Sequence, residues 1–292
     1  MNFIFLREIF SARWKAFVLV GSFLVLFSAC DWINPVEPIP AYLRIEQFQL
    51  QTNVPFQGPS NHKISDAWVY VDGKLLGVFE MPFEVPVIAT GSSEVVVYGG
   101  IKNNGIAASR VVYPFYTAFR TTVDWEELQT ITLDPVVQYH DITQISWLET
   151  FEDPGISLDT TLLSSVALGD SLVSGNRVGR ILLTPGRDSF EAETVDFYEF
   201  PADNPTTYIE MDYLANNEFA VGINMRLPET VIIQPLIYIR PNSEWNKIYI
   251  DASYYAQSTA EAEDFKIFFR AVRNDTVPKA IILIDNLKLV HF

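Results

Sequence analysis

Apolar and polar residues alternate along most of the chain after residue 41, with a period of two. Clear examples are "TYIEMDYL" (207–214), "EFAVGINMRL" (218–227) and "FKIFFRAV" (265–272). Successive side chains of a β-strand point to opposite faces of a sheet, so this pattern predicts strands with one buried face. After the first thirty residues, no window keeps apolar residues at helical spacing over three turns. We therefore expect an almost all-β protein.

The stretch "AWVYVDGKLLGVF" (67–79) predicts a β-hairpin. It places two strand-like runs on either side of Asp72-Gly73, a pair that favours a type I′ turn. Residues 93–116 repeat this arrangement around "NNG" at 103–105. We expect residues 41–142 to form a small β-sandwich.

The segment "VYVDGKLLGVFEMPFEVPV" (69–87) resembles PEGA-type repeats, small β-sandwich modules with a V-x-V-D-G-K-x-x-G hairpin. The resemblance covers about twenty residues, and any hairpin with a type I′ turn is the alternative. Pro82 stands where the repeats usually have Thr-Pro. The matching residues are Val69, Val71, Asp72, Gly73, Lys74 and Gly77.

A second domain is predicted over residues 143–292. It opens with "ISWLETFEDPG" and closes with "AIILIDNLKLVHF" at the C-terminus. This pair resembles the first and last strands of carbohydrate-binding jelly rolls and their galactose-binding-like relatives. The resemblance implies a jelly-roll-like β-sandwich, so the whole fold is expected to be two β-sandwich domains.

The N-terminus has a different pattern. A segment with three basic residues precedes twelve apolar or small residues (16–27) and then "SAC", which is the organisation of a secretory signal peptide over residues 1–29. Twelve residues are fewer than the roughly 20 needed to span a bilayer. An uncleaved membrane anchor is the alternative.

Cys30 is the only cysteine of the chain and directly follows "FSA". This resembles the lipobox of bacterial lipoproteins, in which the cysteine becomes the acylated first residue. Palmitate-type chains contribute about 0.8 kcal/mol of membrane affinity per buried methylene, so several chains anchor firmly. Residues 30–40 hold three prolines and predict a semi-rigid lipidated tether. The resemblance implies an exported cell-envelope protein, and the acidic residues after the cysteine favour the outer membrane, on its periplasmic or outer surface.

The chain is strongly acidic. Its formal net charge is −16, and removal of the leader, with three basic residues and one acid, would make it −18. Such a surface argues against binding nucleic acid and against lying flat on anionic lipid. Solubility and attraction of cations such as calcium are the two remaining explanations.

One stretch, "VALGDSLVSGNRVG" (166–179), resembles the nucleophile block of GDSL (SGNH) esterases, with Ser171 as the nucleophile. Those enzymes need an Asp-x-x-His pair to activate the serine. Here the residues three before the histidines are Pro59, Val137 and Lys288. We therefore expect no catalysis at Ser171, and place Gly169-Asp170 in a turn between strands at 162–168 and 178–184.

Acidic residues stand in apolar rows of the first and last strands of the second domain. In "IILIDNLKLV", Asp285 alternates with Leu283 and Leu287, and in "ISWLETFED", Glu149 alternates with Trp147. Buried carboxylates require a partner. In the jelly rolls that this domain resembles, such acids contribute to a structural calcium site, which implies Glu152, Asp153 and Asp285 as ligands. Alternatively they lie at strand ends, solvated or bonded to backbone amides.

Aromatic residues make up 14% of the chain, and most are expected in the core. Trp245, Tyr254 and Tyr255 are the candidates for stacking on sugar rings. Trp147 is expected to be buried. No P-loop, dinucleotide-binding glycine pattern or metal-spaced His or Cys cluster occurs, so no cofactor apart from calcium is predicted.

Together these features predict a non-catalytic envelope lipoprotein. The first interpretation of its role is that it binds other proteins as a component of an outer-membrane or cell-surface assembly. The alternative is a glycan-binding lipoprotein that uses the jelly-roll domain, an analogy from fold alone.

The lipid anchor is directly testable. We expect intact-mass spectrometry of the membrane fraction to find a chain that begins at Cys30 and carries the added mass of acyl groups. An unprocessed and unmodified N-terminus in that fraction would contradict the prediction.

Overall fold

The computed structural model describes residues 37–201, 204–258 and 262–292. The expected leader, Cys30 and most of the tether lie outside these residues. The predicted all-β class is confirmed, because strands dominate the described chain and the two helices are a single turn or little more. No helix in the described part is long and apolar enough to cross a membrane.

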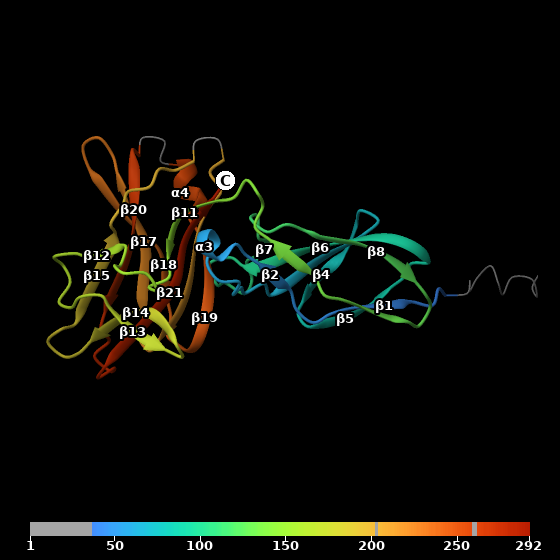
Figure 1. Cartoon of the computed structure of the whole chain (residues 1–292), viewed down its shortest axis with the longest axis horizontal. Helices are drawn as coiled ribbons and strands as arrows, with labels where there is room; N and C mark the ends of the chain where they lie inside the picture. Colours follow the sequence, from blue (N-terminus) through green and yellow to red (C-terminus); the bar gives the residue numbers. More distant parts are fainter. Residues whose placement is uncertain (1–36, 202–203, 259–261) are drawn as a thin grey trace, which may run out of the picture.

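Figure 1 shows two bodies joined side to side. The elongated N-terminal body contains all the elements up to β10, and the C-terminal body contains β11 onward. The N-terminal elements are β1 (Ala41–Ile45), β2 (Gln49–Gln51), α3 (Val54–Gln57), β3 (Asp66–Val71), β4 (Lys74–Glu80), β5 (Phe83–Val87), β6 (Gly91–Lys102), β7 (Arg110–Val112), β8 (Phe119–Trp125), β9 (Thr130–Leu133) and β10 (Val136–Gln138).

The N-terminal strands form three small sheets around one core. Strand β1 lies between β5 and β9, β10 pairs with β2, and a larger sheet has the order β4-β3-β6-β7, with β8 also paired to β6. The predicted hairpin is present: β3 and β4 pair antiparallel, and Asp72 and Gly73 between them have φ of 47° and 74°. Positive φ at both central residues is what a type I′ turn requires.

The C-terminal body is a sandwich of two sheets, one with six strands and the other with five. Its elements are β11 (Gln144–Glu149), β12 (Leu158–Thr160), β13 (Gly169–Val173), β14 (Asn176–Leu183), β15 (Ser189–Thr194), β16 (Thr207–Ala215), β17 (Phe219–Arg226), β18 (Val231–Ile239), β19 (Asn242–Asp251), α4 (Ser253–Ser258), β20 (Asp264–Val272) and β21 (Ala280–His291).

Apart from the hairpins β13–β14 and β17–β18, successive strands of this body cross between the two sheets, as in a jelly roll. The first sheet has the order β13-β14-β21-β16-β19, with β11 also paired to β21, and the second has the order β12-β15-β20-β17-β18. Apolar side chains from both sheets fill the space between them, including Met211, Ile223, Phe269 and Ile284. The other face of the first sheet is turned toward the N-terminal body.

A bulge in β21 changes the alternation expected from the sequence. Asn286 has a positive φ of 51°, and the register of β21 with β16 shifts there. Before the bulge Ile284 points into the sandwich core, and after it Leu287 does, so the two core residues are three apart. Asp285 therefore does not share a face with Leu287, as strict alternation predicted. Asp285 lies on the outer face, as expected next to the core residue Ile284, and the bulge after it returns Leu287 to the core.

The turn expected at Gly169-Asp170 lies elsewhere. Residues 169–173 form strand β13, which pairs with β14, and the hairpin turn is at Ser174-Gly175, with φ of 52° and 95°. The sequence places turn-forming residues both at Gly169-Asp170 and, five residues later, at Ser174-Gly175, and the structure uses the second pair.

The two bodies share a buried aromatic cluster. Tyr113 of the N-terminal body packs edge-on against Tyr208 at 5.4 Å and lies 4.7 Å from Tyr249, centroid to centroid. Phe115 contacts the C-terminal Phe292 at 4.7 Å. These side chains belong to one continuous core with residues of both bodies, so the junction is packed like a protein interior.

A buried charge lies at the centre of this junction. Both oxygens of Glu210, on β16, are held: Tyr113 and Tyr139 of the N-terminal body donate to Oε1 at 2.7 and 2.8 Å, and Lys247 Nζ lies 3.0 Å from Oε2. Lys288 Nζ lies 3.8 Å from the same oxygen. Glu210 and Lys288 are fully buried, so the charged cluster of the C-terminal body depends on two tyrosine hydroxyls of the N-terminal body.

The predicted turn at 103–105 also joins the bodies. The Asn104 amide donates to the Tyr249 carbonyl at 2.9 Å, and the Asn104 side chain accepts from the Asp251 amide at 2.9 Å. Asn103 donates to the Asp251 carboxylate at 3.0 Å. This short parallel bridge to β19 fixes the angle between the two bodies.

We expect Glu210→Gln to destabilise the protein by about 3–5 kcal/mol, because it leaves Lys288 buried without a counter-charge and Lys247 with only Asp212, 3.8 Å away. Urea unfolding at pH 7 measures the effect. Glu94→Gln is the matched control: Glu94 pairs with Arg120 at 3.5 Å with both side chains exposed, and its loss is expected to cost at most about 1 kcal/mol. Equal effects of the two substitutions would contradict this role of the buried cluster.

The same cluster predicts a pH dependence. Burial raises the pKa of Glu210, but the charges of Lys247 and Lys288 and the bond from Tyr113 outweigh it and lower the pKa to about 2. A folded-state pKa below the ordinary 4.5 contributes stability above pH 4.5 that is lost as the pH falls toward 2. Wild type is expected to lose stability across this window more steeply than Glu210→Gln.

Candidate functional site

A groove runs along the junction between the two bodies. It consists of two adjoining clefts of about 870 and 480 Å³, both lined by Pro59, Asn176, Asp285 and Asn286. We call this the junction groove. One wall is the segment after α3, and the other is the outer face of the first sheet with the β13–β14 turn. The groove is therefore built by elements distant in sequence.

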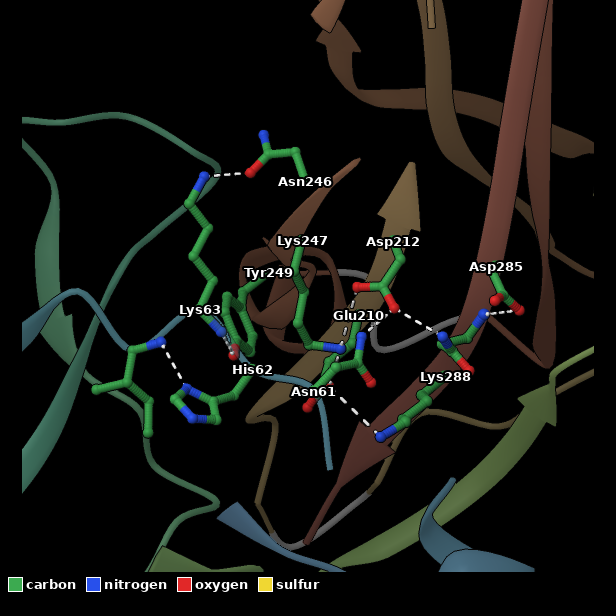
Figure 2. Close-up of polar contacts among 12 residues, drawn as sticks. Asn61, His62, Lys63, Glu210, Asp212, Asn246, Lys247, Tyr249, Asp285 and Lys288 are labelled. Atoms are coloured by element: carbon green, nitrogen blue, oxygen red, sulfur yellow. Dashed lines mark hydrogen bonds and ion pairs between the residues drawn. The ribbon is translucent and has the colours of Figure 1, made fainter. Parts of the chain in front are cut away.

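Asp212 organises the polar groups of the 480 Å³ part of the groove (Figure 2). Its Oδ2 accepts a short bond from Asn61 of the N-terminal body and one of 2.7 Å from Asn286 in the β21 bulge. Its Oδ1 lies 3.8 Å from Lys247 Nζ. One carboxylate thus fixes two amide side chains from the two bodies, so the polar groups of the groove are held in place before any ligand arrives.

Asp285 is the most perturbed acid of the groove. Burial raises its pKa, a hydrogen bond from the Asn286 amide opposes this, and the negative charges of Asp212, Glu152 and Glu149 raise it further, to about 7. On the outer face, next to the bulge, Asp285 is therefore among like charges. A carboxyl with this pKa changes charge near neutral pH.

The structure brings together the three acids implied as calcium ligands in one cleft. Glu152, Asp153 and Asp285 all line the 870 Å³ part of the groove, but Glu152 already accepts from the Arg177 amide at 2.7 Å. Within residues 37–201, 204–258 and 262–292, no three acidic, histidine or cysteine side chains are arranged to hold a metal ion. Calcium binding stays a prediction.

Glu149 follows the other explanation offered for buried acids. It is 6% exposed and accepts hydrogen bonds from the Phe151 amide at 2.7 Å and from the amide and hydroxyl of Ser157 at 2.7 and 2.6 Å. Trp147, buried as expected, donates to the same Ser157 hydroxyl at 2.8 Å. This carboxylate holds the loop 150–157 that forms one end of the groove.

The three aromatic candidates do not lie together. Trp245 is on β19, is 40% exposed and lines the 480 Å³ part of the groove. Tyr254 and Tyr255 follow the other end of β19, on α4, and strand geometry places Asp251 about 20 Å from Trp245. Tyr254 is exposed, whereas Tyr255 packs partly against the sandwich core. Only Trp245 belongs to the groove.

Sequence reasoning missed the groove residues that come from the N-terminal body and from β16. His62 also lines the groove. Burial lowers the pKa of His62, a hydrogen bond to the Phe48 carbonyl raises it in part, and the charge of Lys247 lowers it further. For Asp212 and Glu210 a signal existed: both acids alternate with Ile209, Met211 and Tyr213 in "IEMDY". For Asn61 no local signal exists, because only tertiary packing brings it there.

Ser171 lies opposite Val178 in the β13–β14 hairpin. Among the residues that the structure describes, Ser146 is the serine whose hydroxyl is hydrogen-bonded to a histidine, at His291 Nε2. The other ring nitrogen of His291 lies 3.0 Å from the backbone oxygen of Phe292. Neither Ser146 nor His291 lines the junction groove.

No family model and no curated protein matches the chain. Solved structures that it resembles are carbohydrate-binding modules. The CBM22-2 xylan-binding domain from Paenibacillus barcinonensis Xyn10C matches with a TM-score of 0.38 and 10% identity, over 50% of this chain and 99% of that one. A family 11 module from Clostridium thermocellum, in complex with a β-1,3-1,4-mixed-linked tetrasaccharide, matches at 0.35 and 13%, over 49% and 93%. A mutant of CBM29-2 matches at 0.33 and 14%, over 51% and 85%.

These neighbours are of the class that the jelly-roll resemblance named from the first and last strands of the second domain. At identities of 10–14% and TM-scores of 0.33–0.38, however, we base no functional conclusion on them.

Asp285 gives the groove a measurable pH dependence. Because its folded-state pKa is raised from 3.8 to about 7, the folded protein holds a proton that the unfolded chain has lost, and stability falls as the pH rises through this window. We expect Asp285→Asn to abolish that fall and to stabilise the protein at pH 8 by about 1–2 kcal/mol, after allowance for solvent screening. Urea unfolding at pH 5 and pH 8 measures both effects.

The same titration in millimolar calcium tests the implied metal site. Bound calcium would raise the stability of wild type at pH 8 and leave Asp285→Asn unchanged. An equal response of the two proteins would contradict calcium binding at Asp285, and an Asp285→Asn protein that keeps the wild-type pH profile would contradict the raised pKa.

Proposed function

We propose that this protein is a non-catalytic, glycan-binding envelope lipoprotein, and that the junction groove is its sugar site. The observation on which this rests is the position of Trp245, partly exposed beside a fixed set of amides and carboxylates in the junction groove. This is the second of the two functions considered from the sequence, and the groove favours it over a role in protein assembly.

The chemistry of the groove suits a neutral sugar chain. A sugar ring has an apolar face, which packs on a flat aromatic ring, and hydroxyl groups at its edge, which need both donors and acceptors. Trp245 supplies the ring, Asn61 and Asn286 supply amides, and Asp212 and Asp285 supply acceptors. Aromatic walls with a few fixed polar groups are typical of small-molecule sites.

The dimensions of the groove suit more than one sugar unit. Its two clefts of about 870 and 480 Å³ adjoin at Asn176, Asp285 and Asn286, which line both. A single pocket would enclose one ring, whereas an open groove accepts a chain along its length. We therefore propose an oligosaccharide or polysaccharide ligand.

The orientation of the chain suits a membrane tether. Strand β1, where the described chain begins, lies at the end of the N-terminal body remote from the C-terminal sandwich (Figure 1). An anchor at Cys30 would therefore hold the groove away from the membrane surface, in reach of envelope or external polysaccharide.

A second function has its own observation. Strand β18 is an edge of the second sheet and exposes Val231, Ile232 and Ile233, at 55%, 39% and 52%. An exposed apolar edge strand is open to pairing with another chain. The proposed role in an outer-membrane or cell-surface assembly would use this edge and not the groove.

The sugar site is tested by substitution of its aromatic residue. We expect the soluble chain from residue 31 to bind neutral oligosaccharides on a glycan array, and Trp245→Ala to weaken that binding by 10-fold or more, because the sugar loses its stacking surface. Isothermal titration with the best array ligand measures the change.

Tyr254→Ala is the matched control, since Tyr254 is a more exposed aromatic residue at the other end of β19. It is expected to bind as wild type does. An array without hits would overturn the sugar site, as would a Trp245→Ala protein of unchanged affinity. A stoichiometric protein partner lost when Ile232 is replaced by Lys would favour assembly instead.

A further inference from the structure

A second cleft lies at the junction, on the other side of the Asn246–Lys247 segment from the groove. It has a volume of about 460 Å³ and is lined by β18, β19 and the N-terminal body. Four basic residues line it, Lys63, Lys102, Arg240 and Lys247, and no acidic residue does. We call it the cationic cleft. In a chain with 36 acidic and 20 basic residues, a concave site with this composition requires an explanation.

Two of the four basic residues are occupied by protein carboxylates. Lys247 pairs with Glu210 at 3.0 Å, as described above, and Lys102 pairs with Glu80 at 3.0 Å. The other two, Lys63 and Arg240, pair with no carboxylate in the part of the chain that the structure describes. Their charges are available to a ligand.

Lys63 is held at the edge of the cleft. Its Nζ donates to the Asn246 side chain, and its backbone amide donates to the Tyr249 hydroxyl at 3.0 Å (Figure 2). Partial burial lowers its pKa, and the charge of Lys102 lowers it further. The negative charge of a bound anion would act against this lowering, so the free protein places a cation where an opposite charge is missing.

The rest of the cleft is apolar and aromatic. Ile239, Ile248 and Tyr249 are buried beneath it, and Tyr238 and Ile106 stand at its rim with 64% and 55% of their surface exposed. Asn104 and Asn246 add amide groups. A small inorganic anion would leave the exposed apolar surface of Tyr238 and Ile106 unused, whereas a ring with an apolar face and one negative group would use both the apolar rim and the basic residues.

We infer that the cationic cleft binds an acidic sugar unit, with the carboxylate of a uronic acid between Lys63 and Arg240 and the ring against Tyr238. The sugar class rests on the proposed function, since the cleft adjoins the junction groove through Asn246 and Lys247. The negative charge rests on the cleft alone. An arginine fork binds a carboxylate with two parallel hydrogen bonds, which a lysine does not.

The two sites have opposite charge. Asp212, Asp285 and Glu152 line the junction groove, so a uronate carboxylate is repelled there and attracted to the cationic cleft. A polysaccharide that alternates neutral and acidic units would meet both. A dense polyanion is disfavoured by the net charge of −16.

The test uses trimers of galacturonate, mannuronate and guluronate, each compared with its methyl ester. Esterification removes the charge and keeps the sugar. We expect wild type to bind at least one acid trimer and to bind its ester at least 10-fold more weakly, as measured by isothermal titration. Lys63→Gln/Arg240→Gln is expected to weaken binding of the acid by 10-fold or more and to leave the ester unaffected.

Lys74→Gln/Lys279→Gln is the matched control, because it removes two charges at exposed sites outside the cleft. It is expected to change affinity less than 2-fold. If both double variants weaken binding equally, general electrostatic attraction is the cause and the inference is overturned. It is also overturned if no acid trimer binds, or if acid and ester bind alike.

Failure here differs from failure of the proposed function. If neutral sugars bind in a manner that depends on Trp245 and no acid-selective binding is found, the sugar site in the groove stands and the inference about the cationic cleft is overturned. Acid-selective binding that depends on Lys63 and Arg240, without any neutral ligand, would do the reverse.

Discussion

The structure depends on one buried carboxylate. Glu210 accepts hydrogen bonds from two tyrosine hydroxyls of the N-terminal body and pairs with two lysines of its own sheet. Because the cluster is buried, water cannot take the place of a lost partner. A buried ion cluster of this kind contributes little net stability compared with an apolar core, but it strongly penalises any arrangement that leaves a charge unpaired. It therefore selects one docking of the two bodies, which the aromatic cluster around Tyr113 then fills. The junction is the part of the molecule where both candidate sites occur.

Both sites follow from that docking. The junction groove and the cationic cleft lie on either side of the Asn246–Lys247 segment of β19. Lys247 is shared by both, but its charge is directed to Glu210 and Asp212. As a result, the groove is dominated by carboxylates, and the cleft by Lys63 and Arg240. Two neighbouring surfaces of opposite charge, which share Asn246 and Lys247, suit a ligand with both neutral and charged units better than they suit a uniform polymer.

The candidate site was predictable only in part. Asp285 was identified because a carboxylate stands in an apolar strand, and Trp245 because its flat ring can stack on a sugar; both line the groove. The face of Asp285 was wrong, because the bulge at Asn286 interrupts the alternation on which that prediction relied. Trp245 and the tyrosines at 254–255 were grouped by closeness in sequence, but an extended strand separates residues that a loop would bring together. Asn61 and Asp212 were missed because their meeting is a contact between the two bodies.

The sequence by itself determined the all-β class, the Asp72-Gly73 hairpin and the strands that begin and end the second body. These features depend on period-two alternation and turn residues, which act over a few neighbouring positions. The tertiary structure alone decided which strand faces form the junction, where β21 bulges, and which charges remain without a partner. Those outcomes depend on contacts between residues far apart in the chain, such as Tyr113 with Glu210, and local patterns contain no information about them. The groove and the cleft exist because two locally predictable bodies pack through a buried charge.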